Sequence, residues 1–264
     1  MNVGKSSVCR SVSCINMDNQ EIIVLNRKKT RIYLLNKIPS EHFALRKRED
    51  IRNMLDKVFT NNQVTIAGEV VSDFEFSHEV YGENFYIVNI AVCRLSSSYD
   101  VIPVMVSERL IDVKADYKGC TLQASGQFRS YNRHEEVKNR LVLSVFAREI
   151  EIVTPEDDGQ NPNHIFLDGY VCKKPVYRKT PLGREIADVL LAVNRPYGKS
   201  DYIPCICWGR NARFADQFEV GSHIQLWGRI QSREYQKKID EDTYEKRVAY
   251  EVSVSKLEYL PEEQ

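Results

Sequence analysis

The stretch AVNRPYGKSDYIPCICWGR (192–210) decides the fold, because nearly the same pattern occurs earlier in the chain as AVCRLSSSYDVIPVMVSER (91–109). Each position of the later stretch lies 101 residues after its counterpart, and the same offset relates Gly68 to Gly169. Self-similarity at a fixed spacing indicates a duplicated structural unit. About 100 residues is the usual size of a small domain. The sequence therefore predicts two copies of one domain.

Outside the two copies the composition changes. TPEDDGQNP (154–162) is acidic and holds a proline near each end, which is typical of a linker. Residues 1–60 are basic and irregular in hydrophobic pattern, so we expect a poorly structured extension, and we consider Met54 as the natural start of translation. The predicted organisation is an extension (1–60), a first copy (61–153), a linker (154–162), a second copy (163–260) and a short tail (261–264).

Short runs rich in Val, Ile, Tyr and Phe, bounded by Gly, Pro, Asn and Asp, indicate β-strands in both copies. A turn at 180–183 and a short helical segment at 211–218 separate runs of the second copy. Five strands with such a connector, in about 100 residues, are typical of the OB-fold. The predicted class is all-β, with two tandem five-stranded Greek-key OB-fold barrels. The predicted strands are near 63–71, 84–94, 100–106, 120–130 and 140–152, and near 164–172, 185–195, 202–208, 223–234 and 247–259.

Comparison of the copies separates the two faces of one strand, because successive strand side chains point to opposite sides of a sheet. Cys205 and Cys207 share one face, and the first copy has Val104 and Val106 at the matching positions. Cysteine and valine replace one another as small buried residues. This pattern predicts a core position rather than a metal or redox pair.

Large aromatic residues distinguish the second copy from the first. Tyr202, Trp208 and Trp227 stand where the first copy has valine, serine and serine. A packed core does not accept such changes in volume, whereas an exposed face does. Exposed Trp and Tyr on a barrel strand are typical of proteins that stack nucleobases. We interpret these aromatics as a stacking surface, with the alternative that Trp208 or Trp227 is simply packed.

Basic residues are interleaved with these aromatics, as expected of a groove that follows a phosphate backbone. Taken singly, each also fits an ordinary solvated surface charge. The chain has 37 basic and 37 acidic residues, but a neutral protein binds a polyanion when its cations lie on one face. The candidate phosphate contacts are Arg178, Lys179, Arg184, Arg195, Lys199, Arg210, Arg229, Arg233, Lys237 and Lys238.

Signals for catalysis, metal binding and membrane insertion are missing from the sequence. The five histidines are scattered and match no zinc-ligand spacing, and Gly4-Lys5-Ser6 lacks the first glycine and the preceding strand of a phosphate-binding loop. No apolar run approaches the roughly 20 residues of a membrane helix. Seven cysteines without close pairing fit a reducing compartment. We expect a cytoplasmic, nucleoid-associated protein with no enzymatic activity, metal or cofactor.

The second copy resembles the bacterial single-stranded DNA-binding protein family. The resemblance rests on NHIFLDGYVCKKPVYRKTPLGREIADVLLAVNRPYGKSDYIPCICWGR (163–210) and GSHIQLWGRIQSREY (221–235). It implies an OB-fold that binds single-stranded DNA with little sequence preference and protects it in replication, recombination or repair.

The same resemblance implies site residues and an assembly. Family stacking aromatics carry over to Tyr202, Trp208 and Tyr235, and Tyr197 is a further candidate in a loop shorter than is usual in the family. Family members usually carry one OB-fold and form tetramers, so two folds per chain suggest a homodimer with four. Replication or repair proteins are expected as further partners.

Two other functions stay open at the level of sequence. One is a protein-binding OB scaffold, such as a primosome-like adaptor, which would suit the first copy with its net charge of 9 − 13 = −4 and its missing aromatics. The other is single-stranded RNA binding, because a stacking groove does not by itself read the 2′-hydroxyl. We expect a division of labour in which the second copy grips the strand and the first supplies dimer contacts or a partner surface.

Overall fold

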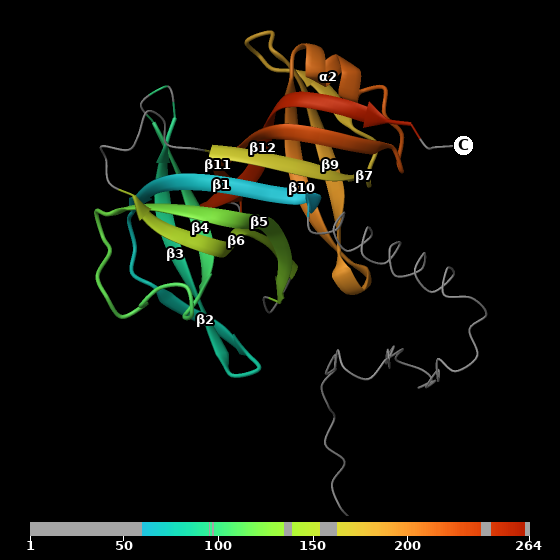
Figure 1. Cartoon of the computed structure of the whole chain (residues 1–264). Helices are drawn as coiled ribbons and strands as arrows, with labels where there is room; N and C mark the ends of the chain where they lie inside the picture. The colour runs from blue at the N-terminus through green and yellow to red at the C-terminus, as the bar shows by residue number, and fades with distance from the viewer. Residues whose placement is uncertain are drawn as a thin grey trace, which may run out of the picture. The chain divides into compact units, whose positions relative to one another are not determined.

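The computed structural model describes residues 60–94, 96, 98–134, 139–153, 163–238 and 244–261 (Figure 1). The predicted extension, apart from Thr60, lies outside these ranges, as do Met54 and the linker at 154–162. Leu55–Gln264 form one compact unit that holds both copies. No helix in the described ranges is long and apolar enough to cross a membrane.

Both copies consist mainly of strands. A 3-10 turn (Pro196–Gly198) and the short helix α2 (Arg210–Ala215) connect strands of the second copy. In the first copy the strands are β1 (Asn62–Val70), β2 (Glu75–Val80), β3 (Glu83–Cys93), β4 (Tyr99–Ser107), β5 (Thr121–His134) and β6 (Asn139–Val153). In the second they are β7 (Asn163–Val171), β8 (Val176–Lys179), β9 (Glu185–Arg195), β10 (Lys199–Trp208), β11 (His223–Lys238) and β12 (Tyr244–Leu260).

Each copy closes into a barrel. In the first, the order β1-β3-β4-β6-β5 returns to β1, because β1 pairs with both β3 and β5. The second repeats this order as β7-β9-β10-β12-β11, closed by pairing of β7 with β9 and β11. The β4–β6 and β10–β12 pairs are parallel, whereas the other pairs that close each barrel are antiparallel. The predicted tandem OB-fold is confirmed.

Each copy has one more strand than the sequence predicted. β2 and β8 form hairpins with β3 and β9, through turns in which Gly82 and Gly183 have φ of 79° and 78°. The side chains of β2 and β8 are mostly exposed. These strands therefore lack the apolar alternation from which strands are predicted. The barrel itself keeps the five predicted strands.

Side chains at matching strand positions of the two copies fill the interiors of the two barrels. Cys205 and Cys207 are 3% and 1% exposed, and the matching Val104 and Val106 are fully buried. The predicted core role of the cysteines is thereby confirmed. Gly169 shows why the repeat keeps its glycines, because a Cβ there would lie 2.5 Å from the carbonyl oxygen of Ala192.

The two barrels share one continuous sheet. β1 and β7 pair antiparallel with Val64 opposite Ile165, so β6-β5-β1-β7-β11-β12 forms an unbroken run across both copies (Figure 1). The equivalent first strands of the two copies thus meet each other. The chain has the arrangement of a symmetric dimer whose halves are covalently joined.

A buried ion pair of the second copy fixes the first copy beside it. Arg195 Nε donates to Asp201 Oδ2 at 2.5 Å, and its Nη2 donates to the carbonyl oxygen of Ser130 on β5 at 2.9 Å. Asp201 in turn accepts the backbone N–H of Ser130 at 2.5 Å. One arginine–aspartate pair therefore satisfies both main-chain groups of a residue in the other barrel.

The first copy makes the same contact in the opposite direction. Arg94 Nε donates to Asp100 Oδ2 at 2.7 Å, and its Nη2 donates to the carbonyl oxygen of Ser232 on β11 at 2.8 Å. Asp100 accepts the backbone N–H of Ser232 at 2.6 Å. We call these two reciprocal clusters, Arg94–Asp100–Ser232 and Arg195–Asp201–Ser130, the inter-barrel clamps.

Candidate nucleic-acid interface

The outer face of β10 carries two exposed aromatic rings. Tyr202 is 47% exposed and Trp208 is 37% exposed, while the cysteines between them point into the core. Trp208 Nε1 donates to Ser253 Oγ on β12 at 3.1 Å, which fixes the indole against the neighbouring strand. Tyr202 and Trp208 are six positions apart, so their Cα atoms are about 20 Å apart along the strand. They therefore mark a track rather than a single base-sized slot.

Tyr235 belongs to the same face. Gln231 Nε2 donates to Glu251 Oε1 at 2.7 Å, and Glu251 lies two residues before the hydrogen-bond partner of Trp208 on β12. Alternation along β11 then places Tyr235 on that side, 37% exposed, with the guanidinium carbon of Arg233 at 5.9 Å from its ring centre. Three of the predicted stacking residues thus share one outer face of the second barrel.

Trp227 is packed differently. Its ring centre lies 5.1 Å from that of Phe166 on β7, and Lys256 Nζ lies 4.3 Å from the indole centre. A bulge after Trp227 interrupts the alternation of β11. The structure therefore does not bring Trp227 to the exposed rings of β10, and the alternative of a packed ring describes it better. The sequence could not distinguish the cases, because the bulge is invisible in the pattern.

Two predicted residues are described by their backbone alone. Tyr197 lies in the 3-10 turn and Lys238 ends β11, but their side chains lie outside the described part of the structure. Tyr244 is a further candidate that the sequence missed. It pairs with the end of β11, is 57% exposed, and lies in a segment that the sequence pattern left outside the strands.

Arg195 has a structural role instead of the free phosphate contact predicted for it. Its guanidinium is held by the carboxylate of Asp201 and the carbonyl of Ser130 in the inter-barrel clamp. The repeat contained this signal, because Arg94 and Asp100 recur as Arg195 and Asp201 with the same spacing. In each copy the arginine of this pair contacts the other barrel, so the pair holds the two barrels together.

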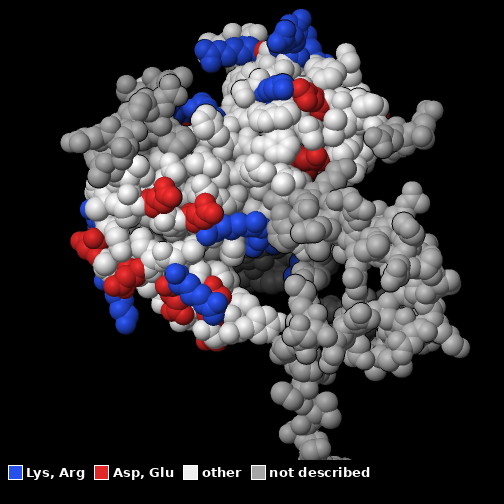
Figure 2. All heavy atoms as spheres, in the orientation of Figure 1, with Lys and Arg blue, Asp and Glu red and all other residues white. Residues whose placement is uncertain are grey.

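The other candidate cations divide by their partners. Arg178 donates to Asp188 through Nε at 2.9 Å and Nη2 at 3.2 Å, and Arg233 Nε lies 3.9 Å from Glu251. Arg229 and Lys237 are half-buried. Figure 2 shows Lys and Arg side chains gathered near α2 and the β8–β9 hairpin. The exposed candidates without an ion pair to another described residue are Lys179, Arg184, Lys199 and Arg210.

The described residues contain no group of three His, Cys, Asp or Glu placed to hold a metal ion. Burial raises the pKa of the Cys205 thiol well above its ordinary value and that of Cys207 to about 12. Thiolates are the form that binds metals and attacks disulfides. These two cysteines are therefore chemically inert core residues at neutral pH.

The geometry defines the chain as a pair of joined OB-folds, one of which presents an aromatic and basic outer face. Residues 162–260 match the model of the single-strand binding protein family. Single-stranded DNA-binding protein 2 of Listeria innocua is 36% identical over 106 residues, which cover 37% of this chain and 64% of that protein. Single-stranded DNA-binding protein A of Bacillus subtilis is 36% identical over 81 residues, which cover 28% of this chain and 48% of that protein.

The fold of both barrels has a counterpart among solved structures. The wild-type single-stranded DNA binding protein from Thermus aquaticus superposes with a TM-score of 0.60 at 17% identity, over 77% of this chain and 94% of that one. This coverage is more than one barrel contains, so the similarity of fold extends over both. Residues 162–260 are thus similar to the single-strand binding protein family, and the chain spans less than two thirds of the length of the curated relatives it matches.

Proposed function

We propose that this protein binds single-stranded DNA without chemical catalysis. Bases stack on Tyr202, Trp208 and Tyr235, while nearby lysines and arginines neutralise the phosphates. Sequence preference is slight, because every base offers a π-face. Bound strands are protected from re-pairing during replication, recombination or repair, in the cytoplasm at the nucleoid.

The observation that carries this proposal is the shared face. Three exposed aromatic rings, from β10 and β11, lie on one side of a barrel whose sequence matches the family model. Exposed Tyr and Trp rings on a barrel strand offer flat surfaces on which successive bases can stack. Nearby cations such as Lys199 and Arg210, which form no ion pair with another described residue, suit a polyanion.

The test is a tryptophan-fluorescence titration with oligo-dT, matched duplex DNA and single-stranded RNA across a salt series. We expect oligo-dT to quench strongly, with a log–log salt slope of about −0.7 per phosphate neutralised. Equal affinity for RNA would favour the RNA-binding alternative. Retention of no nucleic acid would contradict the proposal and favour the adaptor.

We also propose that two chains associate and bring four OB-folds together. Support comes from the aromatic cluster on the outside of the shared sheet, where Trp227 contacts Phe166 and Tyr170 stacks on His223 with 4.5 Å between ring centres. Sedimentation equilibrium measures the assembly directly. A mass equal to one chain would contradict this part of the proposal and leave DNA binding standing.

A further inference from the structure

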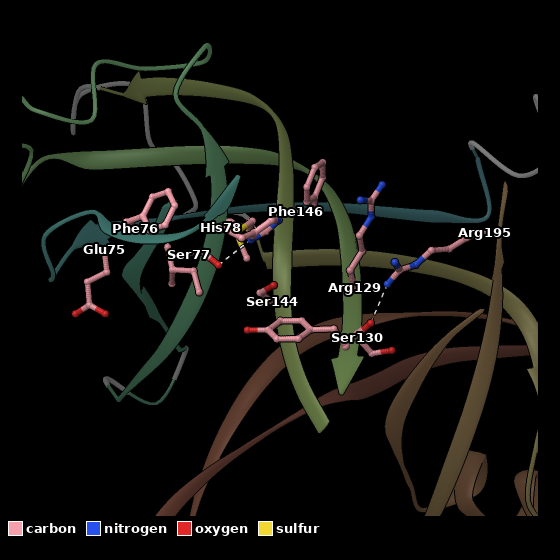
Figure 3. A pocket seen from close by; sticks show the side chains of 12 residues that line it. Glu75, Phe76, Ser77, His78, Arg129, Ser130, Ser144, Phe146 and Arg195 are labelled. Carbon is pink, nitrogen blue, oxygen red and sulfur yellow. Dashed lines mark hydrogen bonds between the residues drawn. The ribbon is translucent and has the colours of Figure 1, made fainter. Parts of the chain in front are cut away.

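A pocket of about 670 Å³ opens in the first barrel, which lies outside the segment that matches the family model (Figure 3). Phe76 and His78 on β2 form one side, and Arg129 and Tyr131 on β5 with residues of β6 form another. Arg195 reaches it from the second barrel. Pockets of roughly 300–1,000 Å³ are the size that holds a small organic ligand.

Aromatic rings line this pocket even though the tryptophan of β10 has no counterpart on β4. Phe146 lies beside Met105 in the parallel β4–β6 pair, as Ser253 lies beside Ile206 in the second barrel. Ser253 is the residue that holds Trp208. Phe146 on β6 thus occupies the position that Ser253 has beside Trp208 in the second barrel. Aromatic rings line the first barrel although Ser107 stands where the second copy has Trp208.

These rings form a column that ends in a cation. The ring of His78 stacks on Phe85 with 5.2 Å between centres, and Phe85 lies 5.7 Å from Phe146. The guanidinium carbon of Arg129 lies 3.9 Å above the centre of Phe146. Beside the column, Phe76 meets the ring of Tyr86 edge to face with 5.8 Å between centres, and it remains 61% exposed where it lines the pocket.

The charge of Arg129 is only partly compensated. Its Nη2 donates to Gln127 Oε1 at 2.9 Å, while its Nε is buried without a hydrogen-bond partner among the described residues. Burial, followed by repulsion from Arg195 and Arg148, lowers the pKa of Arg129 to about 10, while attraction to Asp201 opposes this shift. Asp201 already accepts from Arg195 in the clamp. A guanidinium for which the described residues supply no ion pair favours an incoming anion at its terminal nitrogens.

We propose that this pocket binds one nucleotide of a single DNA strand, with the base against Phe76 and Tyr131 and the phosphate on Arg129. The inference rests on the proposed function and assigns to the first barrel a contact with the same strand. The pocket adjoins the face of the second barrel, because the backbone N–H of Tyr202 donates to Oγ of Ser130 at 2.8 Å and Ser130 lines the pocket. A strand leaving Tyr202 enters the pocket next.

The experiment uses the full chain and oligo-dT longer than the roughly 16 nucleotides that one OB-fold occupies at most. Phe76→Ala removes an exposed ring, and Arg129→Gln removes the cation. Tyr81→Asn is the matched control, because Tyr81 lies in the same hairpin, is 98% exposed, does not line the pocket and has a φ of 51° that asparagine tolerates. We expect Phe76→Ala to weaken binding about fivefold or more, the effect of losing one stacked base.

Photocrosslinking with 5-iododeoxyuridine in the oligo-dT locates the contact independently of any loss of stability. We expect crosslinked peptides that contain Phe76 or Tyr131, besides peptides of the second barrel. If the wild type binds and Trp208→Ala weakens it, but Phe76→Ala and Arg129→Gln behave like Tyr81→Asn and no first-barrel crosslink forms, the pocket inference is overturned and the proposed function stands. If the wild type binds no oligo-dT, both are overturned.

Discussion

Replacing Asp100 by asparagine tests whether the inter-barrel clamps hold the two copies together. The Asp100 side chain is 0% exposed and accepts hydrogen bonds from Arg94 and from the backbone of Ser232 in the other barrel. Breaking a buried ion pair by removing one partner costs about 3–5 kcal/mol. Asparagine keeps one acceptor oxygen and Arg94 is 27% exposed, so we expect the lower end, about 3 kcal/mol.

The matched control is Asp188→Asn. Asp188 accepts two hydrogen bonds from Arg178, at 2.9 and 3.2 Å, so the chemistry of the pair is that of the clamp. The two side chains are 52% and 45% exposed, however. Exposed ion pairs contribute about 0–1 kcal/mol because water already solvates both charges. The two substitutions therefore differ in burial and in the contact with the other barrel, because only Asp100 accepts the backbone N–H of Ser232.

Urea and thermal unfolding, followed by circular dichroism, measure both variants. A loss of about 3 kcal/mol lowers Tm by about 6–12 °C for a unit of about 200 residues. Because Asp100 joins the barrels, its variant should also separate the unfolding of the two copies into distinct steps. Equal and small losses for Asp100→Asn and Asp188→Asn would refute the reasoning, since burial would then not matter.

The contribution of Asp100 also depends on pH. Burial favours the neutral acid, but hydrogen bonds from Arg94 and Ser232 outweigh burial and hold the pKa of Asp100 below its usual value. An aspartate in the unfolded chain has a pKa of about 3.9, so this stabilisation is complete above about pH 4. It is lost as the pH falls through the lower folded-state pKa. The difference in stability between wild type and Asp100→Asn should therefore narrow below about pH 4.

Three further predictions concern the site and the core. Trp208→Ala should weaken oligo-dT binding by about 1–3 kcal/mol in a fluorescence-anisotropy titration, whereas Trp227→Phe should leave it unchanged because that ring is packed. Gly169→Ala should lower Tm sharply in a calorimetric scan, because its Cβ would lie 2.5 Å from the carbonyl oxygen of Ala192. An unchanged Tm would show that β7 and β9 move apart at no cost and would contradict this prediction. Cys207, with its pKa raised to about 12 by burial, should react with a thiol reagent at neutral pH only after unfolding in urea.

Several features of this protein were predictable from the sequence because they depend on local pattern and on comparison of the two copies. The fold follows from short alternating runs repeated at an offset of 101 residues. Cys205 and Cys207 stand where the first copy has valine, and Trp208 stands where it has serine. These differences between the copies distinguish the core face of β10 from its outer face. Strand alternation is a property of neighbouring residues, so it can be read without knowing which strands pair.

Tertiary structure decided the partners of these residues. The contact of Trp208 with Ser253 spans 45 residues, that of Arg195 with Ser130 spans 65, and each exists only because particular strands lie side by side. The same is true of Phe146, whose place beside β4 brings an aromatic ring to the outer face of the first barrel. The sequence determined which residue types each face carries, and the order of strands in the closed barrels determined which of them meet.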